Sequence, residues 1–578
     1  MTCRQSWAGL LLCLLLPSAA RAQVERIART PQELSAAIAA SGPGDTVVMA
    51  NGTWTNVVIS FFAEGAEGDT ITLRAETPGQ VVLNGASRLR IGGTYLKVDG
   101  LWFDGGELRS GHVIEFRRSS SRLTNRSRLT NCAITDYNPP DRLTEYKWVS
   151  VYGTHNRVDH CHFAGKDHDG ATVVVWLRDP PNDRPVWHQI DHNYFGHRPE
   201  LGKNGGESLR IGTSSRSMQD ANVTVEHNLF EECDGEIEII SNKSGNNTYR
   251  HNTFRRSSGV LTLRHGNKAH VYGNFFLGEG KHGAGGVRII GERHRVYNNY
   301  FQDLEGTDYR AALAIVNGVP NSPLNRYFQV RNAVIAFNTF VNVEEAFAVG
   351  AGKSSEQSLA PDSLLIANNL VVTASGPIIN YEDEPLNVTY QSNIFHGAPL
   401  GIPQVGGIST TDPELTFGAD LWRPASASPA IGAAMEIDFA TQDIDGQNRD
   451  SAPDIGADEL ASSPILYRPL LAQDVGPSYM GLILQSVSPT PEKLAVELST
   501  YPNPFRNAAT IRFELERPSH VQLTIYDLLG REVAVLLNET RNAGVHSAKF
   551  NASGLASGAY LAVLGVDGIR LTQTMVRH

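Results

Sequence analysis

Cysteine is scarce in this sequence. Five of its 578 residues are cysteines, and two of them, Cys3 and Cys13, lie in a leader segment that we expect to be removed. The remaining Cys132, Cys161 and Cys233 are too few for a disulfide framework, and none has the CxxC spacing of a zinc site. The composition therefore excludes a small fold that depends on disulfides or on cysteine-bound zinc.

Long apolar runs are also missing. The run from Leu10 to Leu16 is too short to span a bilayer, and a small-residue cleavage pattern follows it at 20–22. This arrangement predicts a signal peptide at residues 1–22. No later segment approaches the ~20 apolar residues that a membrane span needs. We therefore expect an exported protein without an integral membrane segment once the signal is removed.

Amphipathic helical patterns are rare, and a different repeat is present. An asparagine returns among apolar neighbours at its tightest intervals of 24, 22 and 25 residues. The runs between are short and rich in Val and Ile, with polar corners, which is typical of strands. A repeat of this length predicts a parallel β-helix whose coils stack the asparagines at one inward corner. The repeating residues are Asn193, Asn228, Asn252, Asn274, Asn299, Asn338, Asn369 and Asn393, with Cys132 and Cys161 at the same phase upstream.

The pattern changes near residue 460. We predict a β-helix domain at 23–460, a linker at 461–495 and a small β-sandwich at 496–578, where alternating strands have sandwich-like spacing. The last segment resembles the C-terminal sorting domain of type IX secretion substrates, through YPNPF at 501–505 and GREV at 530–533. This resemblance implies that the secretion machinery of a Gram-negative bacterium is a partner. The mature protein would then be secreted or attached to the cell surface.

Charge is distributed unevenly along the chain. The formal net charge is -11, yet residues 241–296 contain ten Lys or Arg and only two acids. Just before this stretch, Glu236 and Glu238 lie two apart in an apolar run. A basic island beside an acidic pair, on an acidic protein, indicates a site for a polyanion that also holds a cation. We expect a polyanion as the ligand, and a monomeric protein; the resemblance of this region to a known family, described below, implies an anionic polysaccharide rather than a nucleic acid.

Strand parity places these residues on one face. Alternate side chains of a strand point to opposite sides, so the isoleucines next to Glu236 and Glu238 can point inward and leave both glutamates outside. The outward residues Arg210, Glu238, Arg264 and Arg288 are 28, 26 and 24 residues apart, which is about one coil each. The sequence therefore predicts that these four residues form one column on the outer face.

The acidic pair predicts a metal site. Two carboxylates about 6–7 Å apart on one strand repel each other, and a shared cation relieves that repulsion. Oxygen ligands without cysteine or paired histidine favour Ca²⁺ over Zn²⁺. Asn204, in the glycine-rich loop LGKNGGES one coil upstream, is a candidate neutral ligand beside Glu236 and Glu238.

Several motifs together resemble polysaccharide lyase family 6, which comprises alginate lyases and chondroitinase B on a right-handed parallel β-helix. They are NGGESLRIGTS from Asn204, then EIEIISNKS, VLTLRHGN and GGVRIIG, and the resemblance spans about 25–460. It implies that Lys243 is the catalytic base and Arg264 the acid or assisting residue. It also implies that Asn204, Glu236 and Glu238 bind calcium, and that Arg288 and His265 line the substrate groove.

The chemistry of such a lyase suits these residue types. Breaking a 4-linked uronate by β-elimination removes the C5 proton beside a carboxylate and expels the C4 oxygen. Charge then develops on the carboxylate, which Ca²⁺ and cationic side chains stabilise. Lys243 must be neutral to accept the proton, and a nearby metal and Arg264 would favour the neutral amine.

Two functions of different classes remain open at this point. The first is an exported lyase for uronate polymers, with alginate favoured over dermatan or chondroitin sulfate; Arg210 and Arg310 are further candidate substrate contacts. The second is a non-catalytic glycan-binding surface protein, which the presence of Lys243 and Arg264 in matching contexts disfavours. A hydrolase is also disfavoured, because the only acidic pair lies on one rung.

Overall fold

The computed structural model describes residues 22–179, 184–480, 498–515, 519–527, 531–566 and 569–578. The expected signal peptide, up to residue 21, lies outside the described residues, as does the part of the expected linker from 481 to 495. The chain divides into two compact units, residues 1–481 and 482–578. In the part of the chain that the structure describes, no helix is long and apolar enough to cross a membrane.

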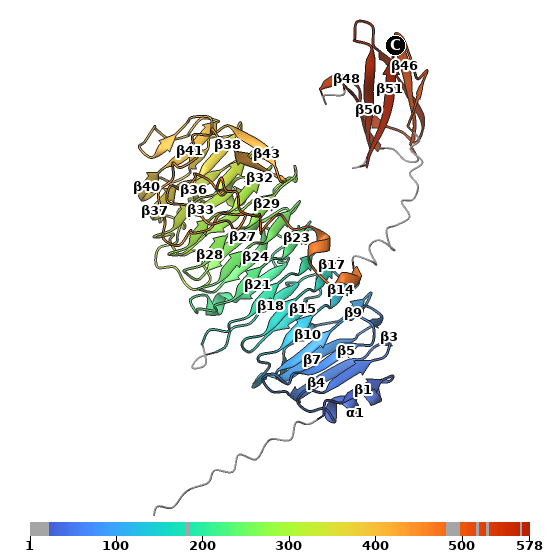
Figure 1. Ribbon diagram of the computed structural model, residues 1–578. Coiled ribbons are helices and arrows are strands. Elements are labelled where there is room, and N and C mark those ends of the chain that lie inside the picture. The colour runs from blue at the N-terminus through green and yellow to red at the C-terminus, as the bar shows by residue number, and fades with distance from the viewer. Residues whose placement is uncertain (1–21, 180–183, 481–497, 516–518, 528–530, 567–568) are drawn as a thin grey trace, which may run out of the picture. The chain divides into compact units, whose positions relative to one another are not determined.

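The first unit is a parallel β-helix, as the asparagine period predicts (Figure 1). Strands of successive coils pair in parallel and build three long sheets over the described residues. Sheet 1 contains, in spatial order, β1 (Glu25–Ala28), β2 (Thr46–Met49), β5 (Ile71–Ala75), β8 (Leu96–Asp99), β13 (Arg128–Thr130), β16 (Arg157–Asp159), β19 (Gln189–Asp191), β22 (Thr224–Glu226), β25 (Thr248–Arg250), β28 (His270–Tyr272), β31 (Arg295–Tyr297), β34 (Val334–Ala336), β37 (Asp362–Ala367) and β40 (Leu386–Gln391).

Sheets 2 and 3 follow the same coil order. Sheet 2 contains β3 (Gly52–Thr55), β6 (Val81–Asn84), β9 (Leu101–Asp104), β14 (Ala133–Thr135), β17 (His162–Ala164), β20 (Tyr194–Phe195), β23 (Leu229–Glu231), β26 (Thr253–Arg255), β29 (Phe275–Leu277), β32 (Tyr300–Gln302), β35 (Thr339–Val341), β38 (Leu370–Thr373), β41 (Asn393–Gly397) and β42 (Ile408–Ser409). Sheet 3 contains β4 (Val58–Glu64), β7 (Arg88–Thr94), β10 (Gly111–Glu115), β15 (Tyr146–Val151), β18 (Val173–Val175), β21 (Leu209–Gly212), β24 (Glu238–Lys243), β27 (Val260–His265), β30 (Val287–Ile289), β33 (Leu313–Val316), β36 (Phe347–Ala351) and β39 (Ile379–Tyr381).

Several short elements lie outside the three long sheets. Two antiparallel pairs lie outside the three sheets: β11 (Arg117–Ser119) with β12 (Arg122–Leu123), and β43 (Leu415–Gly418) with β44 (Leu421–Pro424). The single-turn 3₁₀ helices are η1 (Ser214–Arg216), η2 (Asp308–Arg310) and η3 (Ala472–Asp474).

One α-helix, α1 (Pro31–Ala39), packs on the first coil. Thr30 is the N-cap: its Oγ1 accepts a hydrogen bond from the Glu33 N–H, and Glu33 Oε2 accepts one from the N–H of the preceding Arg29. The helix buries Leu34, Ala37 and Ile38 in the solenoid core. It therefore covers apolar side chains that the first coil of a stacked repeat leaves without a neighbour.

The asparagine ladder is confirmed. Each asparagine side chain accepts a hydrogen bond from the backbone N–H of the equivalent residue one coil earlier, as Asn252 Oδ1 does from the Asn228 N–H at 3.0 Å. The same bond recurs from Cys161 to Asn393, at 2.9–3.1 Å. All eight asparagines are buried. The repeat thus satisfies the polar backbone groups at a sharp inward corner.

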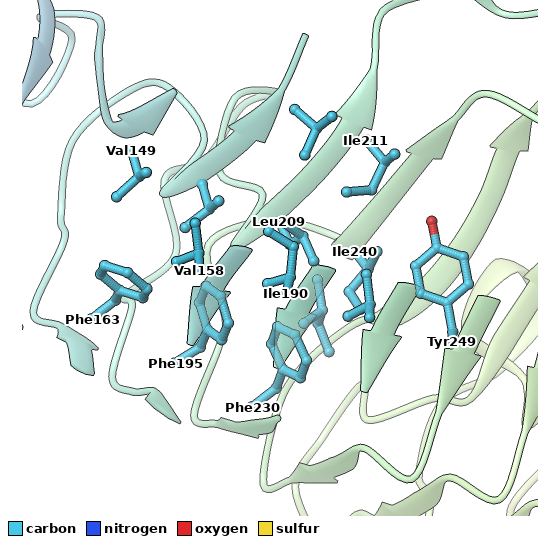
Figure 2. Close-up of a cluster of buried hydrophobic side chains, with 14 of the residues drawn as sticks. Val149, Val158, Phe163, Ile190, Phe195, Leu209, Ile211, Phe230, Ile240 and Tyr249 are labelled. Carbon is cyan, nitrogen blue, oxygen red and sulfur yellow. The ribbon is translucent and has the colours of Figure 1, made fainter. Parts of the chain in front are cut away.

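Apolar side chains fill the interior in stacked rows. Figure 2 shows Phe163, Phe195 and Phe230 on successive coils, and their neighbouring ring centroids are 5.3 and 4.6 Å apart. The row continues to Phe340 with centroid spacings of 4.6–4.9 Å. This regular packing fixes the height of each coil, and so the spacing of the residues on the outer faces.

Residues 461–480, within the expected linker, lie against the solenoid. The Leu470 N–H donates to Thr253 Oγ1, and the Gly476 N–H donates to the carbonyl of His192, both at 2.8 Å. The ring of Tyr467 stacks on His251 with centroids 3.9 Å apart. This segment covers the end of a stacked histidine row, which consists of His160, His192, His227 and His251.

The second unit is a small β-sandwich, as predicted. One antiparallel sheet contains β45 (Ser499–Tyr501), β46 (Ala508–Leu515) and β49 (Gly544–Asn551). The other contains β48 (Glu532–Arg541), β47 (Ser519–Asp527), β50 (Gly558–Val566) and β51 (Ile569–Arg577). Their inner faces share one apolar core, which includes Ile511, Phe513, Leu523, Phe550 and Leu564.

Candidate active site

A bulge shapes the acidic end of β24. Glu238 pairs with Val260 while Ile240 pairs with Leu261, so Ile239 is the extra residue. Ile239 and Ile240 both point into the core. Because a bulge adds one residue, Glu238 and Ser241 lie on the same outer side. Ser241 Oγ donates a hydrogen bond to the Glu238 carboxylate.

The expected parity of the acidic pair needs a correction. Only Glu238 belongs to β24, whereas Glu236 and Ile237 precede the strand and are both half-buried. Ile237 is therefore not a core residue on the same strand as Ile239. The bulge and the preceding turn, rather than simple alternation, position the two glutamates.

The predicted column is also wrong in register. Arg210 pairs with Ser241, Ser241 with Thr262, and Thr262 with Arg288. Glu238 and Arg264 therefore lie beside this column and not in it. A second register shift, between Asn242 and Lys243, leaves Arg264 as an additional residue in β27.

The side chains nevertheless converge on Glu238. Arg288 Nη2 lies 2.5 Å from Glu238 Oε1, and Arg264 Nε lies 3.7 Å from the same oxygen. Glu238 is 7% exposed. Burial by itself raises the pKa of Glu238, but Arg288 and Lys243 outweigh this effect and leave the pKa below its usual value. This carboxylate is therefore ionised and held by cations.

Lys243 ends β24 next to an acid that sequence reasoning missed. Its Nζ lies 3.7 Å from Glu207 Oε1, and Arg210 Nη1 lies 3.6 Å from the same oxygen. Glu207 follows Asn204 in the glycine-rich loop and is 3% exposed. The sequence signal that could have identified Glu207 is an acidic residue in a glycine-rich loop, one coil before Glu236 and Glu238.

Glu236 completes a group of three neighbouring carboxylates. Its Oε1 accepts a hydrogen bond of 3.3 Å from the Gly205 N–H. Burial, then the charges of Glu207 and Glu238, raise the pKa of Glu236 to about 8. Glu207 Oε2 is buried and accepts no hydrogen bond from the described residues. These two observations fit a cation with oxygen ligands, which would relieve the repulsion and fill the empty acceptor.

Asn204 lies beside this group without touching it. The residue is exposed, and its side chain forms no hydrogen bond to Glu236 or Glu238 among the described residues. Its neighbour Gly205 contacts Glu236 through the backbone instead. The ligand role expected for Asn204 stays a prediction.

A buried arginine supports the loop that carries Glu207. Arg198 donates to the carbonyls of Glu207, Gly205 and Gly170 at 2.9–3.1 Å, and to Thr172 Oγ1 at 2.6 Å. Burial lowers the pKa of Arg198 to about 10, so the guanidinium keeps its charge at neutral pH. No motif in the sequence pointed to this residue.

The remaining predicted substrate contacts differ in their surroundings. Arg264 is half-buried, with its guanidinium 4.1 Å from the Tyr327 ring. Arg288 and His265 are 4% and 1% exposed, so neither presents open surface. Burial, then Arg264 and Lys243, lower the pKa of His265 to about 3, which keeps its ring neutral. Arg310 is half-buried in η2, and within the described ranges no ion pair joins it to these residues.

A second acidic cluster lies outside sheet 3. Oxygens of Asp443, Asp445 and Asp458 lie within 4.8 Å of one another. Arg423 forms ion pairs with Asp445, at 2.8 Å, and with Asp458. A side-chain guanidinium already forms ion pairs there, whereas among the described residues no ion pair joins Glu236 to a cation.

The outer face of sheet 3 thus combines an amine, three guanidinium groups and three carboxylates. Lys243 and Arg264 lie at the ends of neighbouring strands, and each contacts one member of the acidic group. A base beside stabilising cations is the arrangement that abstraction of a proton next to a carboxylate requires.

Comparisons with known proteins identify the families of both units. The family model described as Chondroitinase B matches residues 28–427, and the model described as Secretion system C-terminal sorting domain matches residues 499–577. No curated protein matches the chain significantly.

Solved structures give a consistent picture. A mutant of the PL6 family alginate lyase AlyGC is 36% identical over 84% of this chain, with a TM-score of 0.69, and the match covers 60% of that protein. A mannuronic acid specific family 6 lyase from human gut microbiota is 31% identical, covering 68% of this chain and 91% of its own, with a TM-score of 0.59. The PL6 family polysaccharide lyase from Pseudopedobacter saltans is 27% identical, covering 78% and 99%, with a TM-score of 0.60.

The match to AlyGC leaves a good part of that longer protein unmatched, since this chain spans about three fifths of it. The C-terminal match indicates a secreted or cell-surface protein. The solenoid, the sheet 3 site and the family match together show that this chain belongs to the chondroitinase B family, which is polysaccharide lyase family 6, and that it carries a C-terminal sorting domain.

Proposed function

We propose that this protein is an exported lyase that cleaves 4-linked uronate polymers by β-elimination, with alginate as its substrate. The observation that carries the proposal is the placement of Lys243 and Arg264 on neighbouring strands around one acidic group. Solved family members at 36% and 31% identity are described as an alginate lyase and a mannuronic acid specific lyase.

The reaction divides among the residues by their chemistry. Neutral Lys243 Nζ accepts the C5 proton of the sugar, and the C–H electron pair forms the C4=C5 double bond. The C4–O bond breaks at the same time, and the departing oxygen takes a proton from Arg264 or from water that Arg264 orients. The positive charges of Arg264 and Arg288 stabilise the negative charge that develops on the sugar carboxylate.

Calcium is part of the proposal. Glu207, Glu236 and Glu238 are the residues that would hold it, with Asn204 beside them. The raised pKa of Glu236 and the unpartnered Oε2 of Glu207 support a cation at this place. Bound Ca²⁺ would supply positive charge for the sugar carboxylate. Within the described residues Glu236 forms no ion pair, and Oε2 of Glu207 accepts no hydrogen bond although Oε1 contacts Lys243 and Arg210, so these two carboxylates have the most free capacity to bind a cation.

The C-terminal domain makes the secretion machinery a proposed partner, and the polymer would be met outside the cell. Incubation with polymannuronate, polyguluronate and dermatan sulfate tests the reaction and the substrate together. An unsaturated, ultraviolet-absorbing product from either alginate polymer supports the proposal. Activity on dermatan sulfate alone would show that the substrate is a sulfated polymer and not alginate. New reducing ends without a double bond would show that the enzyme is a hydrolase and not a lyase.

A further inference from the structure

A row of residues runs along sheet 3 from Lys243 towards the N-terminal coils. Lys243 pairs with Gly212 on β21. Ile211, which precedes Gly212, pairs with Val175, and Val175 pairs with Val151. Trp176 directly follows Val175, and Tyr152 directly follows Val151. Register therefore places Gly212, Trp176 and Tyr152 next to one another at the ends of successive strands.

The two aromatic rings of this row form a platform. Trp176 and Tyr152 stack with centroids 5.6 Å apart and ring planes 3° from parallel. Both residues are half-buried, so part of each ring is accessible. The two rings cover one face of each other, so their accessible parts include ring edges, which add apolar surface between polar groups. A polysaccharide that leaves Lys243 in this direction would lie on them.

Arginines flank the platform on both sides. Arg117 Cζ lies 4.1 Å from the Tyr152 ring centroid, and Arg210 Cζ lies 5.7 Å from the Trp176 ring. Arg210 also contacts Glu207, which contacts Lys243. The platform is therefore continuous with the candidate active site.

The row ends in a cavity of about 930 Å³. Its walls come from β4, β7, the β11–β12 hairpin and residues 177–179, and its lining includes Arg117, Arg118, Arg122 and Arg178. The acids in the lining are Glu64 and Asp179, and Asp179 forms an ion pair with Arg216. A cationic cavity on a chain with a net charge of -11 is a local concentration of positive charge.

Most of these arginines have no acidic partner. Arg117 pairs with Glu115 at 2.5 Å, but over the described ranges no carboxylate forms an ion pair with Arg118, Arg122 or Arg178. Arg118 and Arg122 are exposed, and Arg118 Cζ lies 5.1 Å from the Phe62 ring. Guanidinium groups without partners keep their full capacity to bind carboxylates in bidentate fashion.

We propose that this cavity is a distal subsite that binds carboxylates of the same polymer chain that is cut at Lys243. The inference rests on the proposed function and adds a binding site to it. β24 and β7 are separated by five strand-to-strand steps, about 24 Å at ~4.8 Å each. The strands between them follow one another along the solenoid in Figure 1. The subsite therefore acts on long chains, and a trisaccharide bound at Lys243 does not reach it.

Kinetics on substrates of two lengths test the subsite. The variant is Arg118→Ala/Arg122→Ala, and its control is Arg29→Ala/Arg293→Ala, which removes the same charge from exposed positions outside the cavity lining. We expect the KM for polymeric alginate to rise about tenfold in the variant, with kcat/KM for a trisaccharide changed less than twofold. The control should match the parent enzyme on both substrates.

Binding provides a second measurement that does not depend on turnover. In a Lys243→Ala background, calorimetry with a long and a short uronate oligosaccharide should show weaker binding of the long one alone when Arg118 and Arg122 are replaced. Arg178→Ala offers a further variant if the hairpin substitutions lower the melting temperature.

The outcomes separate the two proposals. An unchanged KM for the polymer, in a variant that is folded, overturns the subsite and leaves the lyase function intact. If the parent enzyme cleaves no uronate polymer, the proposed function fails. Calorimetry then tests by itself whether the cavity binds the long oligosaccharide. Equal binding of the long oligosaccharide with and without the two arginines then overturns the subsite, and a loss of binding supports it.

Discussion

The guanidinium of Arg288 lies 2.5 Å from the carboxylate of Glu238, although β27 separates the strands that carry them. Two strand steps are about 10 Å, a gap that the long arginine side chain bridges across the outer face. Both residues are buried, at 4% and 7% exposure. This pair connects the acidic group to the arginines of the later coils.

Breaking this pair should destabilise the solenoid. Arg288→Met leaves a buried carboxylate with the Ser241 hydrogen bond and the longer ion pair to Arg264, which should cost about 3–5 kcal/mol in the free energy of unfolding. Chemical denaturation measures the loss, and Arg288→Met/Glu238→Gln should recover part of it. The control is Arg331→Met, which removes an exposed pair with Asp362 and should cost less than about 1 kcal/mol. Equal losses for Arg288→Met and the control would contradict this account.

Calcium should stabilise the protein through the acidic group. Ligand that binds only the folded state raises stability by RT ln(1 + [L]/Kd), so added Ca²⁺ should raise the melting temperature and Mg²⁺ should raise it less. Glu236→Gln should remove most of this response, while Glu414→Gln, at an exposed position, should retain it. A full calcium response in Glu236→Gln would place the cation elsewhere.

A buried histidine should make stability fall in mild acid. Burial lowers the pKa of His188 to about 3, against about 6.5 in an unfolded chain. The unfolded state therefore binds more protons between these values, so the contribution is intact above pH 6.5 and is lost as the pH falls towards 3. At pH 5 the loss amounts to about 2 kcal/mol.

Substitution by asparagine isolates this effect. His188 Nδ1 accepts the Asn156 N–H at 3.0 Å, and Asn156 and Asn247 accept the equivalent bond on other coils. His188→Asn should therefore keep the bond and flatten the dependence of the unfolding free energy on pH between 7 and 5. The same slope in both proteins would show that His188 does not titrate on unfolding.

The asparagine ladder should be costly to interrupt. Asn252→Ala removes the acceptor of the Asn228 N–H and the donor to the carbonyl of Val225, both buried. Each buried group left unsatisfied costs about 1–3 kcal/mol, so the variant should lose about 2–6 kcal/mol of unfolding free energy. Asn448→Ala, at an exposed position, is the control and should lose less than about 0.5 kcal/mol. A loss as small as that of the control would contradict the structural role of the ladder.

Much of the fold could be predicted from the sequence because its signals are periodic. The asparagine interval reports the coil length directly, and one satisfied backbone corner per coil explains why it recurs. The YPNPF and GREV motifs likewise located the sandwich. Strand parity also placed Glu238 and Arg264 on one outer face, where their side chains lie 3.7 Å apart.

The register of the site could not be predicted, because counting residues per coil does not detect bulges. The extra residues at Ile239 and Arg264 carry no sequence signature, and each moves its neighbours by one position. Glu207 and Arg198 were missed for another reason. Their roles depend on a loop folding back towards the next coil, which no local pattern records.

Activity of Lys243→Ala on polymannuronate and polyguluronate, followed by the ultraviolet absorbance of the unsaturated product, tests the central claim most directly. The account predicts about a thousandfold loss of kcat, as expected for removal of a general base. The melting temperature should match that of the parent enzyme, and Lys268→Ala, at an exposed position, should keep full activity. A Lys243→Ala enzyme that forms the unsaturated product at the parent rate would contradict the claim.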